Sequence, residues 1–344
     1  MLKNILVTLA AGAAGGLAFF YIHSPLPWLL GPLAATILLG RFRPGRVCWP
    51  EALRNTGLLV LGYIMGRPFT AEVGRFILSQ LPLMLAMTVV LILASLAAGY
   101  VTHRQTGLSL ATSVLATVPG GLSQMVLLSE EIAGADVAVV TLMQTLRMLS
   151  VVFTVPFLTI HGLPAGAGAA APAAAAGPAE ALPFAAAVIA GGLLAARLRF
   201  PTPYLLGPVL ATAPLVIAGL PAPAVPQPLL TAAQIAVGAY MGSNIDLAGL
   251  VGWRKILGAT LLNVAVLLLV TLLIGYYLAA AIPASPATAF LSTAPGGMAE
   301  MGLTAILVGA DVSVVVGYNL FRVLFILLVM PIFLRRWLGE GRKP

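Results

Sequence analysis

Two arginines stand inside apolar segments of the sequence, at corresponding places in its two halves. Arg147 and Arg322 each follow an aspartate, Asp136 or Asp311, by 11 residues. Along a helix this spacing covers three turns and about 16 Å, which places each arginine near the middle of a bilayer. A guanidinium at that depth needs a partner, and its planar fork suits a carboxylate ligand as well as an acidic side chain. The first interpretation is therefore that the two arginines bind an anion.

A Pro-Gly-Gly motif lies midway along an apolar segment in each half. Residues 117–125 read TVPGGLSQM and residues 293–301 read TAPGGMAEM. Proline lacks an amide donor and glycine permits non-helical dihedrals, so we expect both helices to unwind there. Paired Gly/Pro interruptions in two halves are typical of the substrate site of a secondary transporter, although a simple kink with close packing is the alternative. The predicted substrate-binding residues are Pro119, Gly120, Gly121, Gln124, Pro295, Gly296, Gly297, Glu300, Arg147 and Arg322.

Three carboxylates are candidates for coupling such a site to sodium or a proton. Glu300 stands in a segment otherwise free of charge, and an ionisable group inside a bilayer is a functional candidate because it is costly to bury. Asp136 and Asp311 are the other two predicted ion-coupling residues. Both aspartates also open a predicted helix, where Asp is favoured as a cap, so capping is their alternative role.

The buried charges also have a purely structural interpretation. Glu300 would pair with Arg322, and Arg147 would bond carbonyls near Gln124 and Gln144. Further polar groups in the same segments, Ser123 and Asn319, suit either interpretation.

The composition excludes a soluble globular protein. Of the 344 residues, 60% are hydrophobic and 8% charged, with a mean hydropathy of +1.05, whereas soluble domains carry about 25% charged residues. Residues 76–102, 201–245 and 256–299 each run without a charge. Runs of this length favour helices over the short alternating strands of a barrel. The predicted fold is an all-α polytopic membrane protein in contact with the lipid bilayer.

Metal and nucleic-acid partners are not expected. The formal net charge is +8, but the basic residues lie mostly between apolar segments, where they set membrane orientation instead of binding nucleic acid. One cysteine, Cys48, cannot form an intrachain disulfide, and three scattered histidines give no metal-ligand spacing. We therefore expect no cofactor, no metal and no enzymatic activity.

The chain is a tandem duplication. PLPWLLGP at 25–32 recurs as PTPYLLGP at 201–208, and GYIMG at 62–66 recurs as GAYMG at 238–242, both at an offset of 176 residues. The first motif indicates a helix entry with an aromatic residue at the membrane interface. The second has the spacing of closely packed helices and is also compatible with a homodimer. We predict membrane repeats at 1–160 and 182–344, joined by an Ala/Gly/Pro-rich linker at 161–181.

The basic residues predict the orientation of these repeats. With an odd number of crossings per repeat and the amino terminus inside, nearly all Lys and Arg outside the apolar segments become cytoplasmic. This favours two inverted repeats of about five crossings each, with both termini in the cytoplasm. Each repeat has about six apolar segments, so we expect a broken or re-entrant helix at each Pro-Gly-Gly motif.

The doubled motifs P-x-P-[WY]-L-L-G-P, G-x-x-M-G and P-G-G-[LM]-x-[EQ]-M resemble the bacterial AbrB-duplication membrane protein family. The resemblance covers the chain apart from the linker. It implies an inner-membrane protein in which the arrangement of the repeats is similar to that of the cation/proton antiporter and anion transporter superfamily. Members are often labelled ammonia monooxygenases or AbrB-type regulators. Three dispersed histidines cannot assemble a copper or iron site, and the sequence has no DNA-reading module, so a regulatory effect on gene expression would be indirect.

Together these features predict an inner-membrane secondary transporter that moves a small organic solute by alternating access. The solute is an anion if the arginines bind it, and sodium or protons would drive transport. The alternative is a non-transporting regulatory or scaffolding membrane protein, with a dry centre in which every buried charge is paired.

Overall fold

The computed structural model describes residues 2–43, 45–164, 178–245 and 253–339, and these residues form fifteen helices. The first half contains α1 (Leu2–Tyr21), α2 (Pro27–Phe42), α3 (Glu51–Gly66), α4 (Ala71–Ser79), α5 (Leu81–Thr106), α6 (Leu110–Thr117), α7 (Leu122–Glu131) and α8 (Val137–Gly162). The second half contains α9 (Pro178–Arg197), α10 (Pro203–Ile217), α11 (Gln227–Ser243), α12 (Trp253–Ala281), α13 (Pro286–Thr293), α14 (Met298–Leu307) and α15 (Val312–Leu338). Most of the predicted linker lies outside the described residues.

The helices agree with the predicted membrane protein. Within the described residues, five helices are long and apolar enough to cross a membrane, namely α1, α5, α8, α12 and α15. Many of their large apolar side chains face outward, as lipid-facing side chains would. Helices α1, α2, α3, α6 and α7 begin 176 residues before α9, α10, α11, α13 and α14, respectively.

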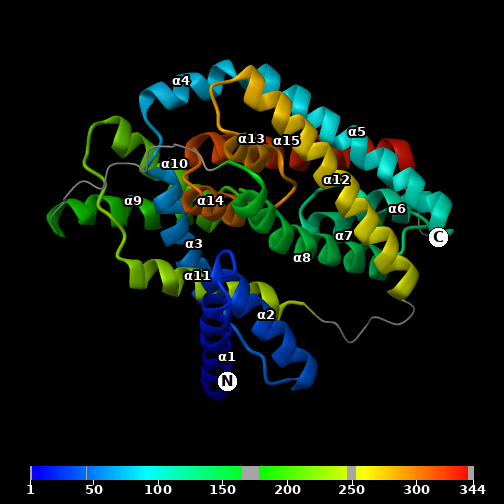
Figure 1. The fold of residues 1–344 in the computed structure, drawn as a ribbon, viewed down its shortest axis with the longest axis horizontal. Coiled ribbons are helices and arrows are strands. Elements are labelled where there is room, and N and C mark those ends of the chain that lie inside the picture. Colours follow the sequence, from blue (N-terminus) through cyan, green and yellow to red (C-terminus); the bar gives the residue numbers. More distant parts are fainter. Residues whose placement is uncertain (1, 44, 165–177, 246–252, 340–344) are drawn as a thin grey trace.

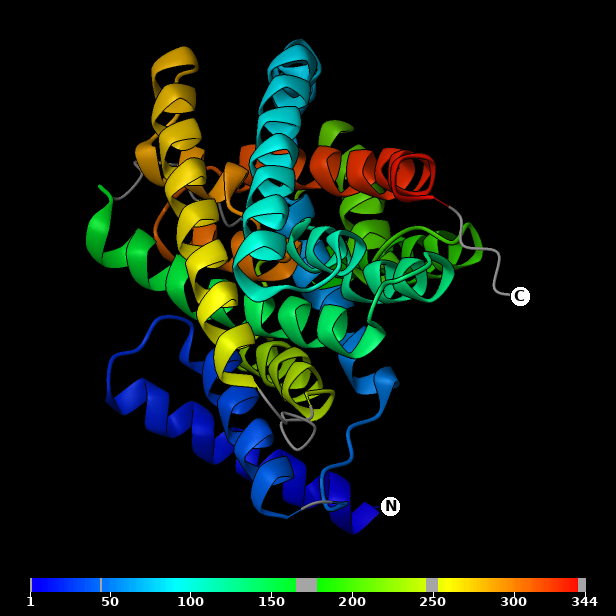
Figure 2. The same ribbon diagram turned by 90° about the vertical axis from the view of Figure 1, so that its right-hand side faces the viewer.

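Apart from α4, the helices form two groups. Helices α1–α3 pack with α9–α11, and α5–α8 pack with α12–α15. In Figure 1 the first group occupies the lower left and the second group the upper right. Figure 2 shows α1 and α2 at the bottom of the molecule, with α5 and α12 rising at the other end. The main contacts between the groups run from α3 to α14 and α15.

The two halves of the sequence interlock within the first group. Helix α3 packs on α10 of the second half, and α11 packs on α2 of the first half. A Cβ atom at Gly62 would collide with the carbonyl of Leu205, and one at Gly238 would collide with the carbonyl of Leu29. The glycines of the GYIMG and GAYMG motifs therefore allow direct contact between helix backbones, as the sequence predicts.

The P-x-P motifs begin α2 and α10 in the same way. Leu26 and Thr202 take left-handed conformations, with φ of 44° and 43°, and the proline that follows each is the first helical residue. Proline suits this position because an amide N–H here would have no helical partner.

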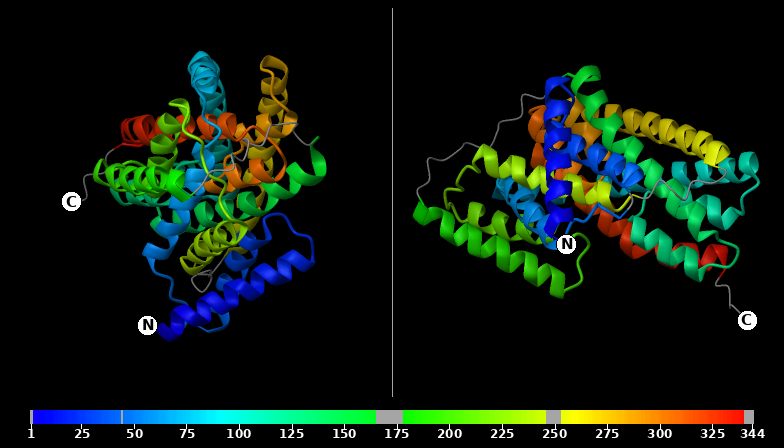
Figure 3. Two further views of the ribbon diagram at one scale, coloured as in Figure 1. Left: turned by 90° about the vertical axis from the view of Figure 1, so that its left-hand side faces the viewer. Right: turned by 90° about the horizontal axis from the view of Figure 1, so that it is seen from below.

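Figure 3 shows α1 across the outer face of the first group and the end of α15 at the far edge of the second.

Candidate functional site

Both Pro-Gly-Gly motifs fall where a helix is interrupted. Helix α6 ends at Thr117 and α7 begins at Leu122, while α13 ends at Thr293 and α14 begins at Met298. The residue before each proline is extended: Val118 has ψ of 128° and Ala294 has ψ of 135°. Proline disfavours the helical conformation of the residue before it, which explains why each helix stops there. Each break leaves carbonyl groups without a helical donor.

The first of these sets of carbonyls is held by Arg147 from α8. Its Nη1 donates to the carbonyl oxygens of Thr117 and Val118 at 3.4 and 2.8 Å, and its Nη2 donates to that of Gly120 at 3.3 Å. The side chain is buried, with 9% exposure. Arg147 therefore binds the broken segment of its own half.

Arg322 on α15 makes the corresponding contacts in the second half. Its Nη1 donates to the carbonyl oxygens of Thr293 and Ala294 at 3.1 and 2.6 Å, and its Nη2 donates to that of Gly296 at 3.1 Å. Arg322 is 5% exposed. Among the described residues, both guanidinium groups thus have neutral carbonyl oxygens, and not a carboxylate, as their partners.

An amide residue stands one turn before each arginine, but the two amides behave differently. Gln144 donates through Nε2 to the carbonyls of Leu115 and Val118 at 2.7 and 3.0 Å. Its Oε1 is buried and has no partner among the described residues. In the second half, Asn319 Oδ1 accepts a hydrogen bond from Arg322 Nη2 at 2.6 Å.

A cavity of about 470 Å³ brings the two breaks together. Both Pro-Gly-Gly motifs and both arginines contribute to its wall, joined by polar groups and by a loop of the first helix group. Its lining residues are Pro119, Gly120, Gly121, Leu122, Gln124, Gln144, Arg147, Met148, Val151, Val152, Pro201, Thr202, Pro295, Gly296, Gly297, Met298, Arg322, Val323, Ile326 and Leu327. A volume of this size is typical of sites for small organic molecules.

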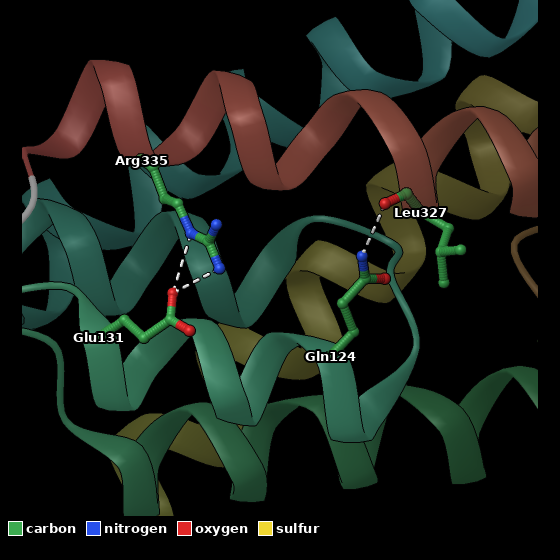
Figure 4. A network of polar contacts seen from close by, with 4 residues as sticks. All are labelled: Gln124, Glu131, Leu327 and Arg335. Carbon is green, nitrogen blue, oxygen red and sulfur yellow. Dashed lines mark hydrogen bonds and ion pairs between the residues drawn. The ribbon is translucent and has the colours of Figure 1, made fainter. Parts of the chain in front are cut away.

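Gln124 connects α7 to the opposite half. Its Nε2 donates to the carbonyl oxygen of Leu327 on α15 at 3.1 Å (Figure 4). Further along the same pair of helices, the exposed residues Arg335 and Glu131 form an ion pair at 2.7 Å. These contacts hold the first broken helix against α15 at the wall of the cavity.

Glu300 occupies the position of Gln124 in the second half, but it is not among the residues that line the cavity; it packs against Gly297, which is. It lies in the first turn of α14 and is 6% exposed. Its carboxylate folds back over Gly297, where a Cβ atom would collide with Oε2. Oε2 is buried and has no partner among the described residues. No ion pair with Arg322 occurs there, so the pairing that the sequence left open is not the one observed.

Asp136 and Asp311 cap helices α8 and α15. Asp136 Oδ1 accepts from the amides of Ala138 and Val139 at 2.9 and 3.1 Å. Asp311 Oδ1 accepts from those of Ser313 and Val314 at 3.0 and 3.1 Å. Neither aspartate is among the residues that line the cavity. These contacts match the capping role that the sequence left open.

Sequence reasoning missed part of the cavity wall. Pro201 and Thr202 belong to the second P-x-P motif, to which the sequence assigned only an interfacial role, yet they border the cavity. The repetition of this motif in the two halves was the feature of the sequence that could have pointed to them. The apolar wall supplied by α8 and α15 had no distinctive signal. Within the described residues, no group of three His, Cys, Asp or Glu side chains lies close enough to hold a metal ion.

Known proteins resemble the chain over nearly its whole length. It is 28% identical to "Uncharacterized protein YhjN" of Bacillus subtilis (strain 168), covering 95% of this chain and 91% of the relative. It is 27% identical to "Putative regulator AbrB" of Escherichia coli (strain K12), covering 93% and 92%. A family model described as "Transition state regulatory protein AbrB" matches residues 28–338. The chain therefore belongs to the AbrB family.

Proposed function

We propose that this chain is a membrane carrier that moves a small organic anion by alternating access. The observation that carries this proposal is the shared cavity, which both broken helices and both buried arginines line. A buried guanidinium whose partners are neutral carbonyls retains its full charge, and a buried charge favours an ion of opposite sign. An anion in the cavity would supply that charge.

Alternating access requires parts that move against each other around the site. The two helix groups make their main contacts through α3, and the cavity lies between them, because Pro201 and Thr202 come from the first group and the remaining lining residues from the second. Movement of one group against the other would open the cavity to alternate sides. In this proposal the halves are inverted repeats with re-entrant broken helices, in a bacterial inner membrane, with both termini cytoplasmic.

Glu300 is the best candidate for coupling to sodium or a proton. It is buried against Gly297, which lines the cavity, and one carboxylate oxygen is without a partner in the described structure. Protonation or a bound cation would each relieve the cost of such a group. Asp136 and Asp311 are less suited to coupling, because their carboxylates already accept hydrogen bonds from backbone amides.

A regulatory or scaffolding protein without transport is the second candidate. Two observations favour it: the arginines use most of their donors on carbonyls, and one relative carries the printed name of a regulator. Under this alternative the arginines only stabilise the breaks, and no solute enters the cavity.

Ligand-dependent stabilisation of the purified full chain in detergent separates the two candidates. A ligand that binds only the folded state stabilises it by about 2.7 kcal/mol at a hundredfold excess over its dissociation constant. A panel of carboxylates and amino acids would be tested with and without sodium and across pH. The variants are Arg147→Lys and Arg322→Lys, which keep the charge but lose the fork. Arg335→Lys is the matched control, since Arg335 lies outside the cavity.

A carrier predicts that at least one anion raises the melting temperature and that the two cavity variants reduce this rise, whereas the control keeps it. Uptake of the same anion into proteoliposomes should then depend on a sodium or proton gradient. If no anion in the panel stabilises the wild-type chain, the scaffolding alternative is favoured.

A further inference from the structure

We propose that the cavity recognises a small hydroxy acid, with Arg147 binding the acid group and Gln144 accepting a hydrogen bond from the neighbouring hydroxyl. This inference rests on the proposed function and narrows its substrate class. The asymmetry between the two halves carries it.

The two arginines differ in how many donors remain for a ligand. A guanidinium has five N–H donors. Arg322 uses four of them, because Asn319 Oδ1 adds a fourth contact to the three carbonyls. Arg147 uses three within the described residues. The first half therefore leaves two donors, enough to bind both oxygens of a carboxylate.

Gln144 supplies an acceptor beside these donors. Its side chain is 1% exposed and lines the cavity, and its Oε1 has no partner in the described part of the chain. The two carbonyls that accept from Nε2 fix which amide atom is the oxygen. Gln144 Nε2 and Arg147 Nη1 donate to the same oxygen, that of Val118. The acceptor and the free donors thus lie within reach of one small molecule.

Asn319 explains why the second half lacks this pair of functions. Its side chain is one methylene shorter than that of Gln144, and its oxygen bonds Arg322 instead of remaining open. An unsatisfied buried acceptor costs about 1–3 kcal/mol, so a ligand donor at Gln144 Oε1 is favoured.

The charges and apolar side chains of the cavity wall indicate which group donates to Gln144 and what the rest of the ligand is like. An ammonium group would be repelled by the two nearby guanidinium groups, whereas a hydroxyl is neutral, so a hydroxy acid fits better than an amino acid. The remaining wall is largely apolar and includes Met148, Val151 and Val152 on α8 and Val323 and Ile326 on α15. The non-polar part of the ligand would lie between these side chains.

The test compares four acids of nearly the same shape by calorimetric titration of the purified full chain. The probes are 2-hydroxy-4-methylpentanoate, 2-methoxy-4-methylpentanoate, 4-methylpentanoate and leucine. The methoxy acid keeps the oxygen but cannot donate a hydrogen bond. We expect the hydroxy acid to bind about threefold to tenfold more tightly than the methoxy and unsubstituted acids, and leucine to bind less tightly than the hydroxy acid.

Two reciprocal variants locate the effect. Gln144→Asn gives the first half the amide of the second, and we expect the preference for the hydroxyl to fall towards one. Acid binding should weaken as well, because the shorter amide would take one of the two free donors of Arg147. Asn319→Gln removes the short amide from the second half and should keep the preference. Should Gln144→Asn fail to fold, the relative affinities of the wild-type chain for the four acids still test the preference for the hydroxyl.

The possible failures are distinguishable. If the wild type binds the acids without preferring the hydroxyl, or if Gln144→Asn keeps the full preference, this inference is overturned and the proposed anion site stands. If none of the four acids binds, the inference is overturned and the proposed anion site loses support as well.

Discussion

Arg147 and Arg322 bind the two broken segments through matching atoms. Arg147 Nη1 donates to the carbonyl of Val118 at 2.8 Å, and Arg322 Nη1 donates to that of Ala294 at 2.6 Å. Both acceptors belong to the residue before the proline of a Pro-Gly-Gly motif. Each guanidinium thus replaces amide donors that the break removes, and the same two side chains also form part of the cavity wall.

Replacing either arginine by methionine should destabilise the protein, and Arg322→Met should do so more. Methionine preserves much of the apolar stem but removes the hydrogen bonds to buried acceptors, at a cost of about 1–3 kcal/mol for each acceptor left without a donor. Arg322 makes four such contacts, including the one to Asn319, and Arg147 makes three. The carbonyls of Val118 and Ala294 keep the amide donors of Gly120 and Gly296. The melting temperatures of the two variants in detergent, without ligand, measure this difference.

Arg335→Met is the control for that comparison. The Arg335 side chain is 43% exposed and forms a surface ion pair with Glu131, so its loss should change stability by less than about 1 kcal/mol. A larger loss for Arg147→Met than for Arg322→Met would contradict the donor count.

Glu300→Gln should preserve folding and remove ion coupling. The change keeps the side-chain shape and gives the second half the residue that the first half has at Gln124. Because Glu300 Oε2 has no partner among the described residues, we expect the melting temperature without ligand to be unchanged or raised. Uptake into proteoliposomes under a sodium gradient or a pH gradient should lose its dependence on that gradient.

Glu131→Gln provides the matched control, because Glu131 is an exposed carboxylate outside the cavity. Uptake by Glu131→Gln should depend on the sodium or pH gradient as uptake by the wild type does. Retained coupling in Glu300→Gln would show that another group carries the ion.

The sequence predicted those features that depend on local chemistry. The breaks at Pro119 and Pro295 follow from the effect of proline on the residue before it. The caps at Asp136 and Asp311, which the sequence offered as the alternative to ion coupling, follow from a carboxylate placed at the start of an apolar helix.

Features that depend on tertiary packing could not be predicted. The sequence offered Glu300 as a partner for Arg322, but the choice between a carboxylate and a carbonyl depends on which atoms the fold brings together. The approach of Thr202 to the cavity depends on how two helix groups dock. The charge-free run 76–102 also conceals a boundary, because α4 ends and α5 begins around Gln80.

Gly62→Ala and Gly238→Ala should each destabilise the protein by about 1–3 kcal/mol. The added methyl group would collide with a backbone carbonyl of a helix from the other half, and a backbone cannot move aside as a flexible side chain can. Gly258→Ala is the control, because a Cβ atom there meets open space on α12. This control should be neutral or stabilising by about 0.4–1 kcal/mol, since it restricts the unfolded chain. Thermal unfolding of the three variants tests the close packing, and equal losses in all three would contradict it.

Asp136→Ala and Asp311→Ala distinguish capping from ion coupling. If the aspartates act as caps, each variant loses about 0.5–2 kcal/mol of stability, while the dependence of ligand binding and uptake on sodium and pH stays that of the wild type. Asp136→Ser and Asp311→Ser should recover most of the stability, because serine also accepts from the amides of the first turn, although it carries no charge. Melting temperatures and gradient-driven uptake are measured on all four variants. Recovery of stability without recovery of coupling in the serine variants would instead assign the aspartates to the ion pathway, because only the charge would then be missing.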